Sequence, residues 1–192
     1  MQRLTKMFLF VLGLNLTIIQ TSNAQTIFSY MKNIWPDSRY QIHNNGTVTD
    51  KYTGLMWKVC SEGQTWSNPS NVATCDGNAA TSSETWSSAL IYAKDNNSYA
   101  GYDDWRLPNV AELRTLLAYD RYSPAINSTI FPNTKTDKDY YTTSPDFTSS
   151  SSYSSWNISF NIPEVKTEGG RGAIITTPST NRDHIRLVRG GS

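Results

Sequence analysis

The first 24 residues constrain this 192-residue chain most, because they decide the compartment in which the rest of it folds. Basic residues open the segment, an apolar run covers residues 7–19, and small side chains follow at Ser22 and Ala24. This order is typical of a secretory signal peptide. The apolar run is shorter than the ~20 residues that cross a bilayer comfortably. We therefore expect residues 1–24 to be a cleaved signal peptide and the remaining chain to be periplasmic, surface-exposed or secreted, with an uncleaved N-terminal anchor as the alternative.

The chain contains two cysteines, Cys60 and Cys75. In an exported protein such a pair predicts a disulfide. The loop that it closes has about 16 residues, which corresponds to about 3 kcal/mol of stability in the chain-entropy model. A zinc site is disfavoured because it needs about four ligands, and the two histidines, His43 and His184, are distant in the sequence. The sequence therefore predicts a structural disulfide, no metal and no cofactor.

The remaining 25–192 segment has the length of one domain and contains no second run that resembles a membrane span. The whole chain has a formal charge of +1, which becomes −1 without the two basic residues of the leader. A nearly neutral protein has no general attraction to nucleic acid. Residues 25–43 are expected to be a lead-in, either a short packed helix or a loose arm. One domain is expected over residues 44–190.

A β-hairpin is predicted near the start of this domain. Asn45-Gly46 is a turn signal, residues 47–49 favour a strand, and the chain turns again before an apolar run over residues 55–59. Residues 61–83 are polar and rich in Gly, Asn, Ser and Pro, so they predict a loop that the disulfide pins.

Two helices are predicted in the middle of the chain. The first covers residues 83–94, with Ser83 as its cap and one apolar stripe. The second begins after Asn109, which forms a capping-box-like pair with Glu112, and continues to about residue 119. Further strands are predicted at residues 140–144, 156–160, 172–177 and 184–189, the last with Ile185 and Leu187 facing inward. This pattern predicts an α+β fold with an antiparallel sheet, two helices and long loops.

Several short segments together resemble a known family. In order they are residues 46–50 (GTVTD), 53–57 (TGLMW), Trp86 with Ala89 and Leu90, 104–109 (DWRLPN) with Glu112 and Leu113, 141–144 (YTTS) and 185–189 (IRLVR). In this order and spacing they resemble the C-terminal domain family of the Legionella collagen-like adhesin, over about residues 44–190. The DWRLPN-x-x-EL block is the most specific of these segments.

The resemblance implies a C-type-lectin-like fold, akin to the formylglycine-generating enzyme and to the variable receptor-binding proteins of retroelements. It also implies a surface or secreted location and ligand binding. The name-giving adhesin domain is a trimer that binds sulfated glycosaminoglycans. This chain has no Gly-X-Y stalk, so trimerisation driven by a stalk is not supported, and an oligomer remains an open possibility. Its YTTS segment is a looser version of the family's usual Tyr-Trp-Thr-Ser-Ser.

The motif residues are expected to build the frame rather than a site. They are Trp57, Asp104, Trp105, Arg106, Pro108, Asn109 and Glu112. We expect Trp105 and Leu107 in the core, Arg106 paired with a carboxylate, and Asn109 as a helix cap. The alternative is that Asp103 and Asp104 act as oxygen ligands for a cation.

No catalytic constellation is recognisable in the sequence. A Ser-His-Asp set with a known spacing is missing, and the two cysteines are expected to be bonded to each other. Oxidase relatives of this fold use reactive cysteines near the C-terminus, and this chain has none there. We therefore expect a protein that is not an enzyme.

A cluster of basic residues late in the chain is the candidate ligand-binding site. Its members are Lys166, Arg171, Arg182, His184 and Arg186. Such side chains can hold sulfate or carboxylate groups. The alternative is a solvated strand face with acidic residues interspersed. The sequence thus predicts an adhesin-like module for a glycan, such as a sulfated polysaccharide, or for a protein. An enzyme of the formylglycine-generating-like fold and a structural subunit of a surface assembly are the other hypotheses.

Overall fold

A computed structural model of the chain describes residues 25–79, 85–146, 155–161, 165–166, 170–171, 174–175 and 183–191. The predicted signal peptide, residues 1–24, lies outside the described residues. Within the described part, no helix is long and apolar enough to cross a membrane.

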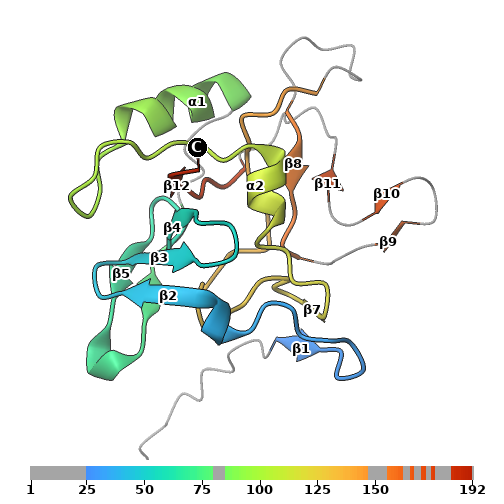
Figure 1. Ribbon diagram of the computed structural model, residues 1–192. Coiled ribbons are helices and arrows are strands. Elements are labelled where there is room, and N and C mark those ends of the chain that lie inside the picture. The colour runs from blue at the N-terminus through green and yellow to red at the C-terminus, as the bar shows by residue number, and fades with distance from the viewer. Residues whose placement is uncertain are drawn as a thin grey trace, which may run out of the picture.

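A four-stranded antiparallel sheet forms the centre of the fold, in the order β12-β4-β3-β2 (Figure 1). Its strands are β2 (Tyr40–His43), β3 (Thr47–Asp50), β4 (Met56–Lys58) and β12 (Val188–Arg189). Val48 lies opposite Trp57, and Trp57 lies opposite Val188. All three side chains are fully buried, so this row of the sheet faces the core. The predicted hairpin over residues 44–60 is confirmed.

The lead-in, residues 25–43, is neither a helix packed on the domain nor a loose arm. Its last residues form β2, the outer strand of the sheet, after a short 3-10 turn at Asp37–Arg39. Its first residues form β1 (Thr26–Ile27), which pairs with β7 (Arg121–Tyr122). The lead-in is therefore an integral part of the folded unit.

Both predicted helices are present, with shifted boundaries. Helix α1 (Trp86–Asp95) lies beside β12, at the end of the sheet opposite β2 (Figure 1). Thr85 caps it by accepting from Ser88 N, and the predicted cap Ser83 lies outside the described residues. Helix α2 (Val110–Arg114) begins with the predicted capping box and ends five residues earlier than predicted. Beyond α2, backbone hydrogen bonds from each N–H to the carbonyl oxygen three residues earlier continue to Leu117. In this arrangement both Leu116 and Leu117 are buried.

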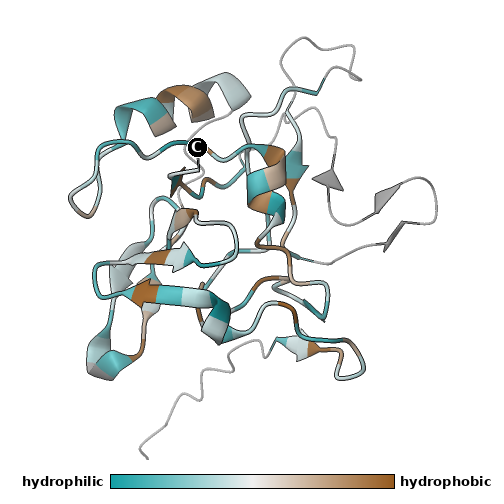
Figure 2. Cartoon of the chain, viewed as in Figure 1, coloured by the Kyte–Doolittle hydropathy of each residue, from teal (hydrophilic) through white to brown (hydrophobic). Residues whose placement is uncertain are grey.

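Two apolar clusters make the core, and apolar residues recur along the sheet strands and on both helices (Figure 2). The larger cluster holds Trp57, Val188, Phe131 and Tyr140. The smaller one joins α1 to Trp105, Ile185 and Leu187. The segment that leads into β12 therefore contributes side chains to the smaller cluster, while β12 itself contributes Val188 to the larger one.

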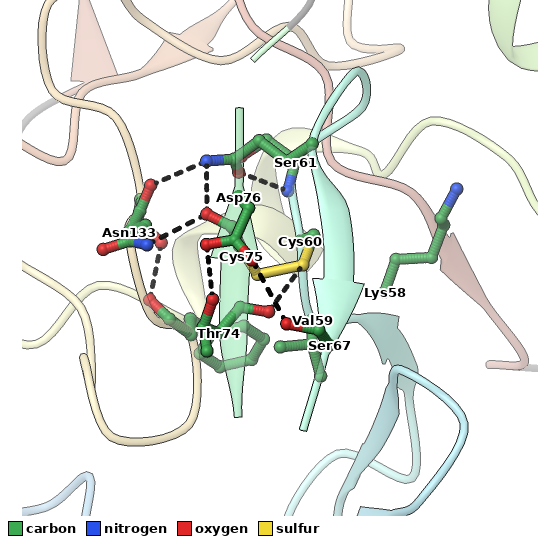
Figure 3. The surroundings of a disulfide bond; sticks show 12 residues. Lys58, Val59, Cys60, Ser61, Ser67, Thr74, Cys75, Asp76 and Asn133 are labelled. Carbon is green, nitrogen blue, oxygen red and sulfur yellow. Dashed lines mark hydrogen bonds between the residues drawn. A yellow bond between two sulfur atoms is a disulfide. The ribbon is translucent and has the colours of Figure 1, made fainter. Parts of the chain in front are cut away.

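The polar segment 61–83 contains strands, so the prediction of a plain loop is wrong. Strand β5 (Thr65–Ser67) pairs with β6 (Thr74–Asp76) in a second hairpin. The predicted Cys60–Cys75 disulfide is present and joins the end of β4 to this hairpin (Figure 3).

Strands β8 (Asn157–Ile158) and β12 are shorter than the strands predicted over residues 156–160 and 184–189, and part of the predicted 172–177 strand lies outside the described residues. Strand β8 pairs with β11 (Ile174–Ile175), and β9 (Val165–Lys166) pairs with β10 (Gly170–Arg171). Of the predicted 140–144 strand only single bridges form, from Tyr140 to Ile158 and to His184. Antiparallel sheets with two α-helices establish the α+β class.

Gly46 occupies a position that no other residue fits. Its φ is +80°, and a Cβ built there would lie 2.1 Å from the Tyr99 hydroxyl oxygen and 3.1 Å from Trp66 Cγ. The Tyr99 side chain cannot move away freely. The Lys58 ammonium lies 4.2 Å from its ring centroid, and Trp105 packs against the same ring. We expect Gly46→Ala to cost about 2–3 kcal/mol, combining backbone strain of ~1 kcal/mol with overpacking of ~1–2 kcal/mol.

The matched control is Gly54→Ala. Gly54 has a similar φ of +73°, but nothing lies within 4 Å of its added Cβ, so only the backbone cost of about 1 kcal/mol is expected there. Urea unfolding of both variants measures the difference. Equal losses of stability in the two variants would show that the contact between the added Cβ and Tyr99 has no energetic cost.

Candidate functional site

A groove with a cavity volume of about 930 Å³ opens in the described surface. Its walls are the loop over residues 132–137, the residues Asn78 and Ala79 that follow β6, and the segments around Gln25, Ser128 and His184. We call it the polar groove, because most of these side chains carry amide, hydroxyl or charged groups. It brings together residues that are more than a hundred positions apart in the sequence.

The disulfide hairpin holds one wall of the polar groove. Asn133, in the 132–137 loop, donates from Nδ2 to the Cys75 carbonyl oxygen at 2.9 Å (Figure 3). Gln64 donates back to the Asn133 carbonyl oxygen at 3.0 Å. The loop is thus tied to β6 at the disulfide itself. The crosslink therefore positions groove residues as well as stabilising the chain.

A histidine–carboxylate pair lies at the groove wall. His184 Nε2 lies 3.1 Å from Asp137 Oδ1. The imidazole is only 2% exposed, and this burial lowers the pKa of His184 although Asp137 opposes the shift. The hydrogen bond with His184 in turn lowers the pKa of Asp137. At neutral pH the pair is therefore a neutral imidazole that donates to a carboxylate.

The polar groove carries little net charge. Its described lining contains one lysine, Lys135, and one carboxylate, Asp137, beside the neutral His184. The remaining polar groups are amides and hydroxyls, which both donate and accept hydrogen bonds. The arrangement suits a ligand with many hydroxyl groups better than one with many anionic groups.

The frame and the motif order agree with one known family. The sequence model of the Lcl C-terminal domain matches residues 46–189, which is more than half of the chain. The chain belongs to the Lcl C-terminal domain family. No curated protein and no solved structure matches it. Membership of the Lcl family indicates an adhesin-like surface module, while the C-type-lectin-like fold stays a prediction.

Several of the motif residues contribute contacts to the frame of the Lcl domain. Trp57 and Trp105 are buried in the core. Arg106 forms a double hydrogen bond with Glu112, at 2.7 and 2.9 Å, and Glu112 also accepts from Asn109 N. The Pro108 carbonyl oxygen accepts from the backbone of the YTTS segment at 2.8 Å.

Asp104 takes part in an ion pair at the surface. Its carboxylate lies 2.6 Å from Arg189 Nε, and this hydrogen bond lowers the pKa of Asp104. The Arg189 guanidinium lies 3.7 Å from the Tyr102 ring centroid. Among the described residues, no group of three or more His, Cys, Asp or Glu side chains is arranged to hold a metal ion.

The two members of the predicted basic cluster whose side chains the structure describes, His184 and Arg186, are both buried. Arg186 is 1% exposed, so the structure contradicts its assignment as a ligand-binding residue. His184 is buried too, although it borders the polar groove. Lys166 and Arg171 lie on the paired strands β9 and β10, and the placement of their side chains is outside what the structure describes, as is the whole of Arg182.

Arg186 instead acts as an internal clamp. Its guanidinium donates to the carbonyl oxygens of Lys58 and Val59 and, at 3.2 and 2.9 Å, to the hydroxyls of Ser61 and Thr134. Burial lowers its pKa from the ordinary arginine value. Because Thr134 belongs to the 132–137 loop, this side chain links the end of β4 to the polar groove.

The polar groove residues Asn133, Lys135 and Asp137 were missed in the sequence. They lie in a region without periodicity, and only a polar run after Pro132 marks them. Nothing in their spacing connects them to His184 or to Asn78.

Proposed function

We propose that this chain is an exported binding module that recognises an uncharged, hydroxyl-rich glycan in the polar groove. One observation carries the proposal: amide, hydroxyl and carboxylate side chains converge on a groove of about 930 Å³ whose wall is held by hydrogen bonds to a disulfide-linked hairpin. Ligand sites are concave and fixed in this way, with a few placed polar groups. Membership of the Lcl family supports a surface-binding role.

The charge of the groove favours a neutral glycan over a sulfated one. Sulfate groups need several accessible cations, and the described lining offers only Lys135, next to Asp137. The hypothesis of a sulfated polysaccharide depended on a basic cluster that includes Arg186, which is buried. A protein ligand at this groove is the other outcome that the test addresses.

Export is part of the same proposal. A disulfide persists in oxidising compartments outside the cytoplasm, and the leader-like first 24 residues fit that location. Cell fractionation of the producing bacterium, with N-terminal sequencing of the protein, tests both points.

Glycan arrays and calorimetry on the chain purified after export test the binding. We expect neutral oligosaccharides to bind, and the double variant Asn78→Ala/Lys135→Ala to weaken that binding at least tenfold. Lys94→Ala, on the exposed face of α1 and outside the groove, is the matched control and should bind as the wild type does. Binding to heparin alone, or no glycan binding by a folded protein, would contradict the proposal.

The His184–Asp137 pair favours an acid–base enzyme as the second candidate function, because such pairs also transfer protons. Mass spectrometry of the bound oligosaccharides after long incubation distinguishes the two. Intact glycans support a binding module. A cleaved glycan whose formation disappears in Asp137→Asn would establish the enzyme.

A further inference from the structure

A second groove, of about 690 Å³, lies between the chain that leads into β2 and the turn that joins β3 to β4. We call it the aromatic groove. Ile34, Trp35 and Pro36 line one side, Tyr52 and Lys51 line the other, and Arg39 lies between them. Its volume is within the range of ordinary ligand pockets. It shares no lining residue with the polar groove.

The aromatic groove exposes apolar side chains that a folded chain usually buries. Tyr52 is 86% exposed and Ile34 is 51% exposed. Trp35 is fixed beneath them, since its indole Nε1 donates to the Thr115 carbonyl oxygen at 2.9 Å. Adjacent exposed apolar side chains with a concave shape are typical of interaction sites.

The turn that presents Tyr52 is held rigidly. The Asp50 carboxylate is fully buried and accepts from Arg39 Nε and Nη2 at 2.8 and 2.5 Å. It also accepts from the backbone N–H of Tyr52 at 3.0 Å and from the Thr53 hydroxyl at 2.9 Å. A side chain presented on a locked turn loses little conformational entropy when it binds.

The charge of the aromatic groove points to an acidic partner. The lining contains two cations, Arg39 and Lys51, and no carboxylate. The charge of Arg39 is neutralised by its ion pair with the buried Asp50 carboxylate. The exposed Lys51 therefore gives the groove a net positive charge. Its hydroxyl-bearing residues are Ser38, Tyr52 and Thr115, and the Thr115 hydroxyl already donates to the Glu112 carbonyl oxygen at 2.7 Å. A sugar would therefore find few partners there.

We propose that the aromatic groove docks an acidic peptide segment of a partner protein. An apolar side chain of the peptide packs on Tyr52 and Ile34, and its carboxylates pair with Lys51 and with the outer face of Arg39. Aromatic and arginine side chains are the residues that most often anchor such contacts. The chain would then hold a glycan at one groove and a protein at the other.

Fluorescence anisotropy with three labelled pentapeptides tests the proposal on the exported protein. The first has one tryptophan flanked by two aspartates on each side, the second replaces the aspartates with lysines, and the third replaces the tryptophan with glycine. We expect the first to bind at least tenfold more tightly than either of the others. Equal binding of the acidic and basic tryptophan peptides would overturn the assignment.

Two variants locate the site, and two others serve as matched controls. Tyr52→Ala should weaken binding of the first peptide at least tenfold, and Lys51→Glu should weaken it at least fivefold. Tyr30→Ala and Lys94→Glu change equally exposed side chains outside the groove and should have no effect. A loss with Tyr30→Ala as large as with Tyr52→Ala would overturn the proposal. So would a loss of glycan binding in Tyr52→Ala, because it would make the groove a sugar site.

The two proposals fail independently. Asn78→Ala/Lys135→Ala should keep its affinity for the peptide, and Tyr52→Ala should keep its affinity for the glycan. Because Tyr52 is exposed, Tyr52→Ala should also retain the wild-type melting temperature, which confirms that any loss of binding is local.

Discussion

Arg186→Met is expected to destabilise the folded chain by several kcal/mol, because hydrogen bonds from a charged donor contribute about 1.5–3 kcal/mol each. The substitution leaves the carbonyl oxygens of Lys58 and Val59 buried without their donors, at about 1–3 kcal/mol for each unsatisfied group. It also removes the guanidinium from the face of Phe131, where it lies 5.0 Å from the ring centroid. Urea unfolding followed by tryptophan fluorescence measures the loss.

Arg189→Met provides the matched control. Arg189 also forms two hydrogen bonds through its guanidinium, but it pairs with Asp104 at the surface. Solvent-exposed ion pairs contribute little to stability, so only a small loss is expected there. If the two variants lost the same stability, the clamp role of Arg186 would be wrong. The Arg186→Lys variant should also be less stable than the wild type, because a lysine ammonium cannot replace the planar set of N–H donors of the guanidinium.

The double variant Cys60→Ser/Cys75→Ser is expected to lose about 3 kcal/mol, because a 15-residue loop constrains the unfolded chain by that amount. The same loss should appear when the wild type is unfolded under reducing conditions. Urea unfolding with and without a reducing agent measures both.

The crosslink should also matter for binding at the polar groove. Cys75 carries the carbonyl oxygen that accepts from Asn133, so loosening the hairpin loosens the groove wall. We expect the double variant to bind the glycan more weakly even under conditions where it is fully folded. Ser67→Ala, which removes an exposed bond to Asp76 in the same hairpin, is the control and should bind normally. If the double variant bound the glycan with unchanged affinity, the disulfide would have no role in positioning the polar groove.

Local features of the fold were predictable because neighbouring residues determine them. The turn at Gly46, the capping box between Asn109 and Glu112, and the hairpin before Cys60 all involve groups a few positions apart. The β5–β6 hairpin was missed because each strand has only three residues and a single apolar one, Trp66 or Cys75, which is too short a pattern to detect.

Neither groove could be derived from the sequence. The polar groove joins the 132–137 loop to His184 and Asn78, and these segments meet only through tertiary packing. The aromatic groove depends on the lead-in lying against the β3–β4 turn, and its aromatic residues also fit an ordinary core.

The sequence by itself determined the disulfide, the α+β class, the capping box of α2 and the family. Only the tertiary structure decided where the side chains of His184 and Arg186 lie. Alternation in residues 184–189 correctly placed Ile185 and Leu187 inward, and the other face was expected to meet solvent. That face is buried as well, because Phe131 and Tyr140 cover it, so Arg186 stabilises the interior. Period-two alternation identifies one buried face, whereas burial of the second depends on distant segments that only the folded chain brings together.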